Sequence, residues 1–375
     1  MEHFDVAVVG LGALGSAAAY HLSGRGVRVV GFEQFELGHV RGASHDTSRI
    51  VRHSYESEEY VRLAVEAYDE WDALEANTGE HLISPSGGVV FCAPDTPVPA
   101  SDYAKALTAV GIAFELLSPA EVSARWAPVR LPDGTVTVYT PTSAIAHAAR
   151  TVATLQLHAR MRGAQLRPRT RVVGLEPGPD GVVVRTQTGA VRAGRVILAT
   201  DAWANELLEP LGAALALEVM QEQVTYFLPQ DPTPFDLGRF PNWIWEGPQS
   251  FYGFPTYGEP TIKAARDASY NLMTPEERTF VPSAELLAEL EGFMASTFVG
   301  SGRALRTVTC QYAITPNREF ILDVVPEHPE IVVGLGAGHA FKYTPVIGRI
   351  LADLATSGGT ASDIARFRMP LASAR

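Results

Sequence analysis

The first 33 residues carry the feature that most constrains the fold. An apolar run from Asp5 to Val9 leads into Gly10-Leu11-Gly12-Ala13-Leu14-Gly15. An alanine-rich helical pattern follows, then a second apolar run that ends at Glu33. This order of strand, G-x-G-x-x-G, helix, strand and acid is typical of a dinucleotide-binding βαβ unit. The sequence therefore predicts that the chain begins with such a unit.

The role of each glycine in this motif has a physical explanation. Gly10 permits the tight turn, Gly12 lets the backbone approach a pyrophosphate, and Gly15 lets the helix pack closely on the strand. The helix N-terminus then faces the phosphates, because its free N–H groups attract anions. Glu33 is placed to accept hydrogen bonds from a ribose.

A second glycine loop, Gly334-Leu335-Gly336-Ala337-Gly338, lies near the other end of the chain. It follows two strand-like runs and precedes a helix that we expect to begin at Pro345, with Thr344 as its cap. The chain has no second complete G-x-G-x-x-G for a separate nicotinamide nucleotide. Nucleotide-binding segments at both chain ends suit a bound flavin whose ring lies between two domains. A further helix is expected from about Ser143 to Arg162.

Composition excludes several classes of function. The net charge is −12 with no basic run, which argues against binding to nucleic acid or to an anionic membrane surface. No apolar stretch approaches the ~18–20 residues needed to span a bilayer. The first strand starts so early that no signal peptide is expected, and Cys92 and Cys310 alone make no disulfide framework. We expect a cytoplasmic protein, and we predict no metal site.

Three further motifs carry a resemblance to a known family. They are Ser48-Arg49-Ile50-Val51-Arg52-His53, Thr309-Cys310-Gln311-Tyr312 and Gly338-His339-Ala340-Phe341-Lys342. Together with the N-terminal unit, and in the same order and spacing over essentially the whole chain, they resemble the monomeric sarcosine oxidase and N-methyltryptophan oxidase family. These are FAD-dependent amine oxidases of the D-amino-acid oxidase superfamily. The resemblance implies FAD as cofactor, a small amino acid and molecular oxygen as reactants, and a monomer.

The resemblance also assigns roles to residues. It implies that FAD is attached covalently through Cys310, that Arg52 and Lys342 hold the substrate carboxylate, and that Lys263 promotes the reaction with oxygen. Two of the three lysines in this arginine-rich chain therefore fall at lysine positions of the family site. The remaining candidates lie beside flavin or substrate by the same comparison: Arg49, Tyr252, Tyr312, His339, His45, Ser44, Gln34, Arg41, Val172, Gly336 and Gly338.

We predict an α/β chain in which an FAD-binding Rossmann-type domain is interleaved with an α+β substrate domain that contains a large mixed sheet. The FAD-binding domain is expected to comprise residues 1–82, 144–213 and 306–375. The substrate domain is expected to comprise residues 83–143 and 214–305. Dense aromatic residues and prolines in the later part of the substrate domain favour a sheet that walls a pocket.

Two positions depart from the family pattern. Asp267 stands where sarcosine oxidases carry histidine, and Ser48 stands where they carry threonine. A related flavoenzyme of nikkomycin biosynthesis, which oxidises a cyclic imine carboxylate, has aspartate at the place of Asp267. Besides an N-methyl amino acid oxidase, the sequence thus leaves open an oxidase of a cyclic secondary amine or imine carboxylate. A dehydrogenase that uses a quinone or carrier protein, and a non-catalytic flavin-binding module, are less favoured because of Lys263 and the joint presence of the site residues.

Overall fold

The structure is a computed structural model that describes residues 1–370. One eight-stranded sheet forms the nucleotide-binding half, with the order β10-β11-β12-β1-β2-β9. In the same sheet, β19 pairs with the C-terminal part of β12, and β18 pairs with β19. The strands β1, β2, β9, β12 and β19 run parallel, as expected of a βαβ unit. Their bounds are β1 Glu2–Val9, β2 Val29–Phe32, β9 Gln165–Arg167, β10 Val172–Gly178, β11 Gly181–Thr186, β12 Gly189–Leu198, β18 Ile321–Val325 and β19 His328–Leu335.

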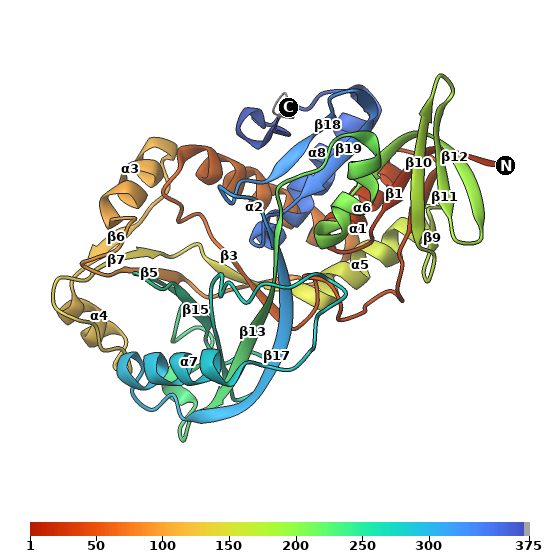
Figure 1. The fold of residues 1–375 in the computed structure, drawn as a ribbon. Coiled ribbons are helices and arrows are strands. Elements are labelled where there is room, and N and C mark those ends of the chain that lie inside the picture. Colours follow the sequence, from red (N-terminus) through yellow and green to blue (C-terminus); the bar gives the residue numbers. More distant parts are fainter. Residues whose placement is uncertain (371–375) are drawn as a thin grey trace.

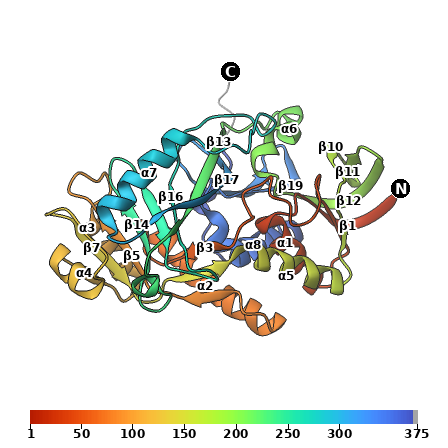
Figure 2. The same cartoon turned by 90° about the horizontal axis from the view of Figure 1, so that it is seen from below.

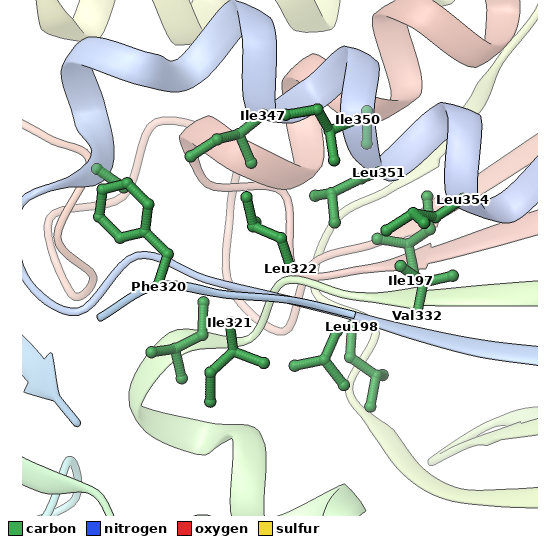
Figure 3. Packing of buried hydrophobic residues seen from close by; sticks show 14 of the residues in the cluster. Ile197, Leu198, Phe320, Ile321, Leu322, Val332, Ile347, Ile350, Leu351 and Leu354 are labelled. Atoms are coloured by element: carbon green, nitrogen blue, oxygen red, sulfur yellow. The ribbon is translucent and has the colours of Figure 1, made fainter. Parts of the chain in front are cut away.

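Helices pack on this sheet (Figure 1), and its apolar residues are buried in one core. They are α1 Ala13–Gly24, α2 Glu58–Thr78, α5 Ala148–Met161, α6 Ala204–Leu208 and α8 Thr344–Ser357. Figure 3 shows Ile347, Ile350 and Leu351 of α8 packed over Leu322 of β18. At Gly348 an added Cβ would lie 2.3 Å from the Cβ of Ala17, so this glycine lets α8 approach α1. The two ends of the chain are thereby joined in one core.

The second eight-stranded sheet has the order β17-β13-β16-β15-β14-β5-β7-β6. It is mixed, because β14 and β5 are parallel and their neighbours are antiparallel. This is the large mixed sheet that the sequence predicts. Its strands and the helices beside it are β5 Gly88–Cys92, β6 Glu115–Leu117, β7 Val136–Thr140, β13 Glu218–Leu228, β14 Asn242–Glu246, β15 Phe251–Phe254, β16 Ile262–Arg266, β17 Arg303–Ile314, α3 Ala100–Val110, α4 Pro119–Arg125 and α7 Ala284–Thr297.

A small third sheet, β3-β8-β4, lies near the middle of the molecule, and Figures 1 and 2 both place β3 there. Its strands are β3 Ser48–Val51, β4 Ile83–Pro85 and β8 Ala144–His147. The strand β3 begins the Ser48–His53 motif, so the family-like arginines emerge between the two large sheets. Short 3-10 turns complete the fold at Asp201–Trp203, Glu209–Leu211, Thr233–Phe235, Ala340–Tyr343 and Ala365–Phe367.

Two local predictions are wrong. The helix expected from Ser143 starts only at Ala148, because Ala144–His147 forms β8 and pairs with β3 and β4. Pairing with a neighbouring strand outweighs the helix propensity of two alanines. Thr344 is not the cap of the last helix but its first residue, and no side chain caps that end. Within residues 1–370 no helix combines the length and apolar character needed to cross a membrane.

Candidate active site

A cavity of about 470 Å³ runs from the ends of β1 and β2 to β14, β15 and β17. It therefore connects the nucleotide-binding sheet with the mixed sheet. Most of the candidates named from the sequence line this cavity: Gly10, Gly12, Ala13, Leu14, Glu33, Gln34, Ser44, His45, Arg49, Arg52, Val172, Tyr252, Asp267, Tyr312, Gly336, Gly338, His339 and Lys342.

Five candidates are not among the residues that line the cavity. Gly15 acts in packing, because an added Cβ would lie 1.9 Å from the carbonyl oxygen of Gly10. The guanidinium of Arg41 lies over the Phe35 ring at 5.0 Å. Ser48 and Lys263 contact each other, with Lys263 Nζ 3.2 Å from Ser48 Oγ. Cys310 is buried on β17, on the same face as Tyr312, because alternate residues of a strand share a face.

The glycine motif forms an anion-binding end of the cavity. Gly10 has a φ of 88°, and an added Cβ there would lie 2.4 Å from the carbonyl oxygen of Ala199. Helix α1 has no side-chain hydrogen bond at its N-cap, Gly12, and no acidic residue in its first turn. The positive end of the helix dipole is thus directed at the cavity. Ser44 Oγ accepts a hydrogen bond from the Ala13 N–H at 2.9 Å and fixes the loop beside it.

Glu33 is held as a carboxylate at the end of β2. Its side chain accepts hydrogen bonds from the backbone N–H groups of Leu11 and Phe35, both at 3.0 Å, and lies 3.3 Å from His39 Nε2. Burial opposes ionisation, but His39 and these N–H groups outweigh it and lower the pKa of Glu33. The acid is therefore charged at the ribose end that the motif predicts.

Three cations of the predicted site line the cavity, and two of them, Arg52 and Lys342, lie against the same tyrosine ring. Arg52 lies 4.3 Å above the Tyr55 ring, and the Nζ of Lys342 lies 5.4 Å from the same ring. The Arg49 guanidinium donates hydrogen bonds of 2.8 Å to the carbonyl oxygens of Ser48, Ala43 and His45. Within the described residues none of the three guanidinium or ammonium groups has a carboxylate partner. An anionic ligand group would therefore be attracted to this part of the cavity.

Lys263 is only 3% exposed and is held by an ion pair that the sequence did not indicate. Its Nζ lies 2.6 Å from Asp46 Oδ2 and donates to the carbonyl oxygen of Ser48 at 3.1 Å. Burial and the nearby Arg49 charge lower the pKa of Lys263 to about 8, although Asp46 opposes the shift. For Asp46, burial is outweighed by the charge and hydrogen bond of Lys263, which lower its pKa to about 2. Tyr226 adds a 2.7 Å hydrogen bond to Asp46.

Asp267 is also paired, in this case with Arg318. Its two oxygens lie 2.9 and 3.3 Å from the Arg318 guanidinium, which outweighs burial and lowers the pKa of Asp267. The carbonyl oxygen of Arg318 lies 2.9 Å from His339 Nε2. Burial first, and then Lys342 and Arg318, lower the pKa of His339 to about 3, so this imidazole is neutral. Arg318 thus connects two residues of the predicted site and was missed in the sequence.

The wall beside Cys310 contains a second buried arginine. Arg278 is 6% exposed and donates hydrogen bonds to the carbonyl oxygens of Val40, Arg41 and Thr309. It therefore ties the loop at the cavity mouth to the residue before Cys310. Burial raises the pKa of the Cys310 thiol, and Arg49 and Arg278 oppose that shift. Cys92 belongs to the apolar core.

Of the two predicted tyrosines, Tyr312 contacts the C-terminal glycine loop. Gly338 has a φ of 80°, and an added Cβ would lie 2.9 Å from the Tyr312 ring. The loop can therefore lie flat against Tyr312 only with glycine at this position. Burial raises the pKa of both Tyr252 and Tyr312, so both are neutral phenols.

No group of three potential metal ligands occurs among the residues described.

Comparison with known proteins agrees with this geometry. The family model for FAD dependent oxidoreductases matches residues 5–354. The chain belongs to this family. The oxidoreductase is 36% identical to a monomeric sarcosine oxidase from Streptomyces avermitilis, over 97% of this chain and 96% of that protein. It is 31% identical to the human peroxisomal sarcosine oxidase, over 98% and 95% of the two chains. The resemblance found in the sequence is thus confirmed.

Among solved structures the oxidoreductase is similar to NikD, described as an unusual amino acid oxidase essential for nikkomycin biosynthesis. An open form of its Tyr258Phe mutant has a TM-score of 0.90 and 29% identity, covering 100% of this chain and 99% of that chain. The predicted fold class, with a Rossmann-type FAD-binding part and a large mixed sheet, is confirmed.

The residues of the cavity fit FAD. The N-terminus of α1, where Ser44 binds the Ala13 N–H and no acidic residue stands in the first turn, suits a pyrophosphate. The loop packs closely there, because an added Cβ at Gly12 would lie 3.0 Å from Ser44 Oγ. Three polar atoms of the lining are buried with no hydrogen-bond partner within residues 1–370: His45 Nε2, Thr200 Oγ1 and Asp201 Oδ2. Buried polar atoms are usually hydrogen-bonded, so a ligand with several polar groups is expected beside them.

Proposed function

We propose that this oxidoreductase oxidises a secondary amino acid, sarcosine or another N-methyl amino acid, at the carbon beside the nitrogen. The products are an imine, which hydrolyses to an aldehyde and the demethylated amino acid, and hydrogen peroxide. The observation that carries the proposal is the placement of cations. Arg52 and Lys342 lie against one tyrosine ring, Tyr55, and Lys263 occupies a separate buried position.

The three cations have two tasks in this proposal. Arg52 and Lys342 hold the substrate carboxylate, because two fixed cations in a cavity orient an anion strongly. This orientation presents the carbon beside the nitrogen for reaction. Bound FAD would supply the two-electron oxidation of the substrate and the transfer of those electrons to oxygen. Lys263 stabilises the negative charge that develops on oxygen, and Tyr252 and Tyr312 border the substrate.

The second candidate is an oxidase of a cyclic secondary amine or imine carboxylate. The observation that favours it is Asp267, whose carboxylate lines the cavity and is held in place by Arg318. A fixed carboxylate favours a protonated nitrogen or a ring N–H. The similarity to NikD supports this alternative only in part.

The deciding measurement is the release of hydrogen peroxide by the purified protein with sarcosine, larger N-methyl amino acids, proline and pipecolate. Faster turnover of an N-methyl amino acid supports the first proposal. Faster turnover of a cyclic acid supports the second. An enzyme with intact flavin that releases no peroxide with any of these compounds would contradict the proposal for N-methyl amino acids.

Replacing Lys342 with methionine is expected to raise KM by about 10- to 100-fold, because a charged hydrogen bond contributes about 1.5–3 kcal/mol. The same change at Arg52 is expected to have an effect of similar size. Both follow from loss of carboxylate binding and are measured by steady-state kinetics on the best substrate. Lys105, which is exposed on α3, provides the matched Lys105→Met control. An unchanged KM in both site variants would contradict the carboxylate-binding role.

The attachment of FAD through Cys310 is also part of the proposal, as are a monomeric state and a cytoplasmic location. Cys310 is supported by its position on the cavity side of β17. We also retain the division into an FAD-binding domain of residues 1–82, 144–213 and 306–375 and a substrate domain of residues 83–143 and 214–305. It is supported by the strands of the two large sheets, which follow these segments except that β17 crosses the boundary at 306.

A further inference from the structure

One carboxylate at the substrate end of the cavity has no task in the reaction described above. Glu246 is the last residue of β14 and lines the cavity together with Arg52, Tyr252 and Asp267. It is partly buried and comes from the mixed sheet, not from the nucleotide-binding motifs. Neither composition nor motif spacing singled it out.

Glu246 differs from the other carboxylates near the substrate position. Asp46 is paired with Lys263, and Asp267 is paired with Arg318. Within residues 1–370, no arginine, lysine or histidine nitrogen lies within the 4 Å of an ion pair with Glu246. Among the three carboxylates described at this end of the cavity, Glu246 is therefore the one without a contacting cation.

Two neutral donors fix the carboxylate in place. The Tyr103 hydroxyl donates to Oε1 at 3.2 Å, and the Ser250 hydroxyl donates to Oε2 at 3.0 Å. Ser250 also accepts a 2.8 Å hydrogen bond from the Asp267 N–H, so the two acids have a fixed relation. A carboxylate has about four lone-pair sites, and two remain for a ligand. Glu246 is thus oriented and retains capacity to bind a donor.

The surroundings of Glu246 favour a cationic ligand group. Burial raises the pKa of this carboxyl, and the charge of Arg52, beyond contact distance, only opposes that shift. A cation brought against Glu246 would offset the cost of burying its charge. Arg52 and Lys342 in the same cavity attract an anion. The cavity can therefore bind an anionic group at the two cations and a cationic group at Glu246.

We propose that Glu246 is a specificity-determining residue that binds a cationic group, an ammonium or a guanidinium, at the end of the substrate side chain. The inference rests on the proposed function. A substrate held through its carboxylate by Arg52 and Lys342 directs its side chain toward Glu246. The preferred substrate is then a secondary amino acid with a basic side chain, in place of sarcosine itself.

The test compares kcat/KM of the holoenzyme for two substrates with equally long side chains. Nα-methyl-lysine ends in an ammonium, and Nα-methyl-2-aminoheptanoate ends in a methyl group. The wild-type enzyme is expected to favour the lysine compound by about 10- to 100-fold, the range of a charged hydrogen bond. In Glu246→Gln, which keeps the shape and removes the charge, this ratio is expected to fall toward one. Glu218→Gln, at an exposed position of β13, is the matched control and keeps the wild-type ratio.

Two outcomes would overturn the inference. A wild-type ratio near one would do so, and so would an equal loss for both substrates in Glu246→Gln, which would make Glu246 a distant counter-charge for Arg52. If no N-methyl compound is oxidised, the proposed function fails. The role of Glu246 is then tested separately by ligand binding. Titration of the flavin absorbance with lysine and with 2-aminoheptanoate then measures two Kd values. Tighter binding of lysine that is lost in Glu246→Gln supports the inference, and equal binding overturns it.

Discussion

Replacement of Lys263 by methionine is expected to slow the reaction with oxygen by about 10²- to 10³-fold, the usual effect of removing one fixed group that stabilises a developing negative charge. The ammonium is buried and is held within contact of Asp46 and Ser48, so it is already in place when oxygen arrives. Anaerobic reduction by the amino acid should change much less, because the carboxylate contacts of Arg52 and Lys342 remain. Stopped-flow measurement of the two half-reactions separates these effects.

The pH dependence gives an independent check of the same residue. With a pKa of about 8, Lys263 is charged below that pH and loses its charge above it. The oxygen reaction of the wild-type enzyme should therefore decline above about pH 8, and the Lys263→Met variant should lack this decline. Asp46→Asn removes the carboxylate that favours the ammonium, so the decline should move to lower pH. Equal slowing of both half-reactions in Lys263→Met would refute the oxygen role.

The nucleotide-binding end could be predicted from sequence because its determinants are local. Gly10, Gly12, Gly15 and Glu33 belong to one continuous βαβ unit, in which spacing along the chain fixes spacing in the fold. The structure confirms this unit, with Gly10 in the left-handed region and an open helix end behind it. Most of the candidate residues likewise line the cavity, although they make up less than half of its lining.

The partners of the site residues could not be predicted in this way. Asp46 reaches Lys263 through the docking of β3 against the mixed sheet, and Arg318 reaches Asp267 across distant loops. Such ion pairs depend on tertiary contacts that no local spacing encodes. Asp46 adopts a φ of 77°, which aspartate tolerates better than most residues, but this preference is too weak to be a signal. Glu246 was missed because its place in the cavity also follows from the tertiary position of β14.

Replacement of Cys310 by alanine is expected to let FAD separate completely from the protein on acid denaturation, whereas the wild-type protein keeps its flavin. Cys310 is the cysteine on the cavity side of β17, and its thiol lies in the field of two arginines, Arg49 and Arg278. A thiolate is the reactive form of cysteine, and neighbouring guanidinium groups favour it. The measurement is the division of flavin absorbance between precipitate and supernatant. Cys92→Ala is the matched control, because Cys92 lies in the apolar core, and should keep the flavin attached.

The two arginines beside Cys310 allow a second test of the covalent linkage, through the rate of FAD attachment. The Arg278 guanidinium donates hydrogen bonds to carbonyl and hydroxyl oxygens and lies 4.3 Å from the Phe280 ring, and within the described residues no carboxylate forms an ion pair with it. Its charge favours ionisation of the Cys310 thiol. Arg278→Met should therefore slow the incorporation of FAD into the apoprotein, while Arg278→Lys should retain part of the rate by keeping the charge. Fluorescence of the denatured protein band follows the attached flavin over time. Flavin that stays with the Cys310→Ala precipitate would place the linkage at another residue and remove the reason for two buried guanidinium groups at this wall.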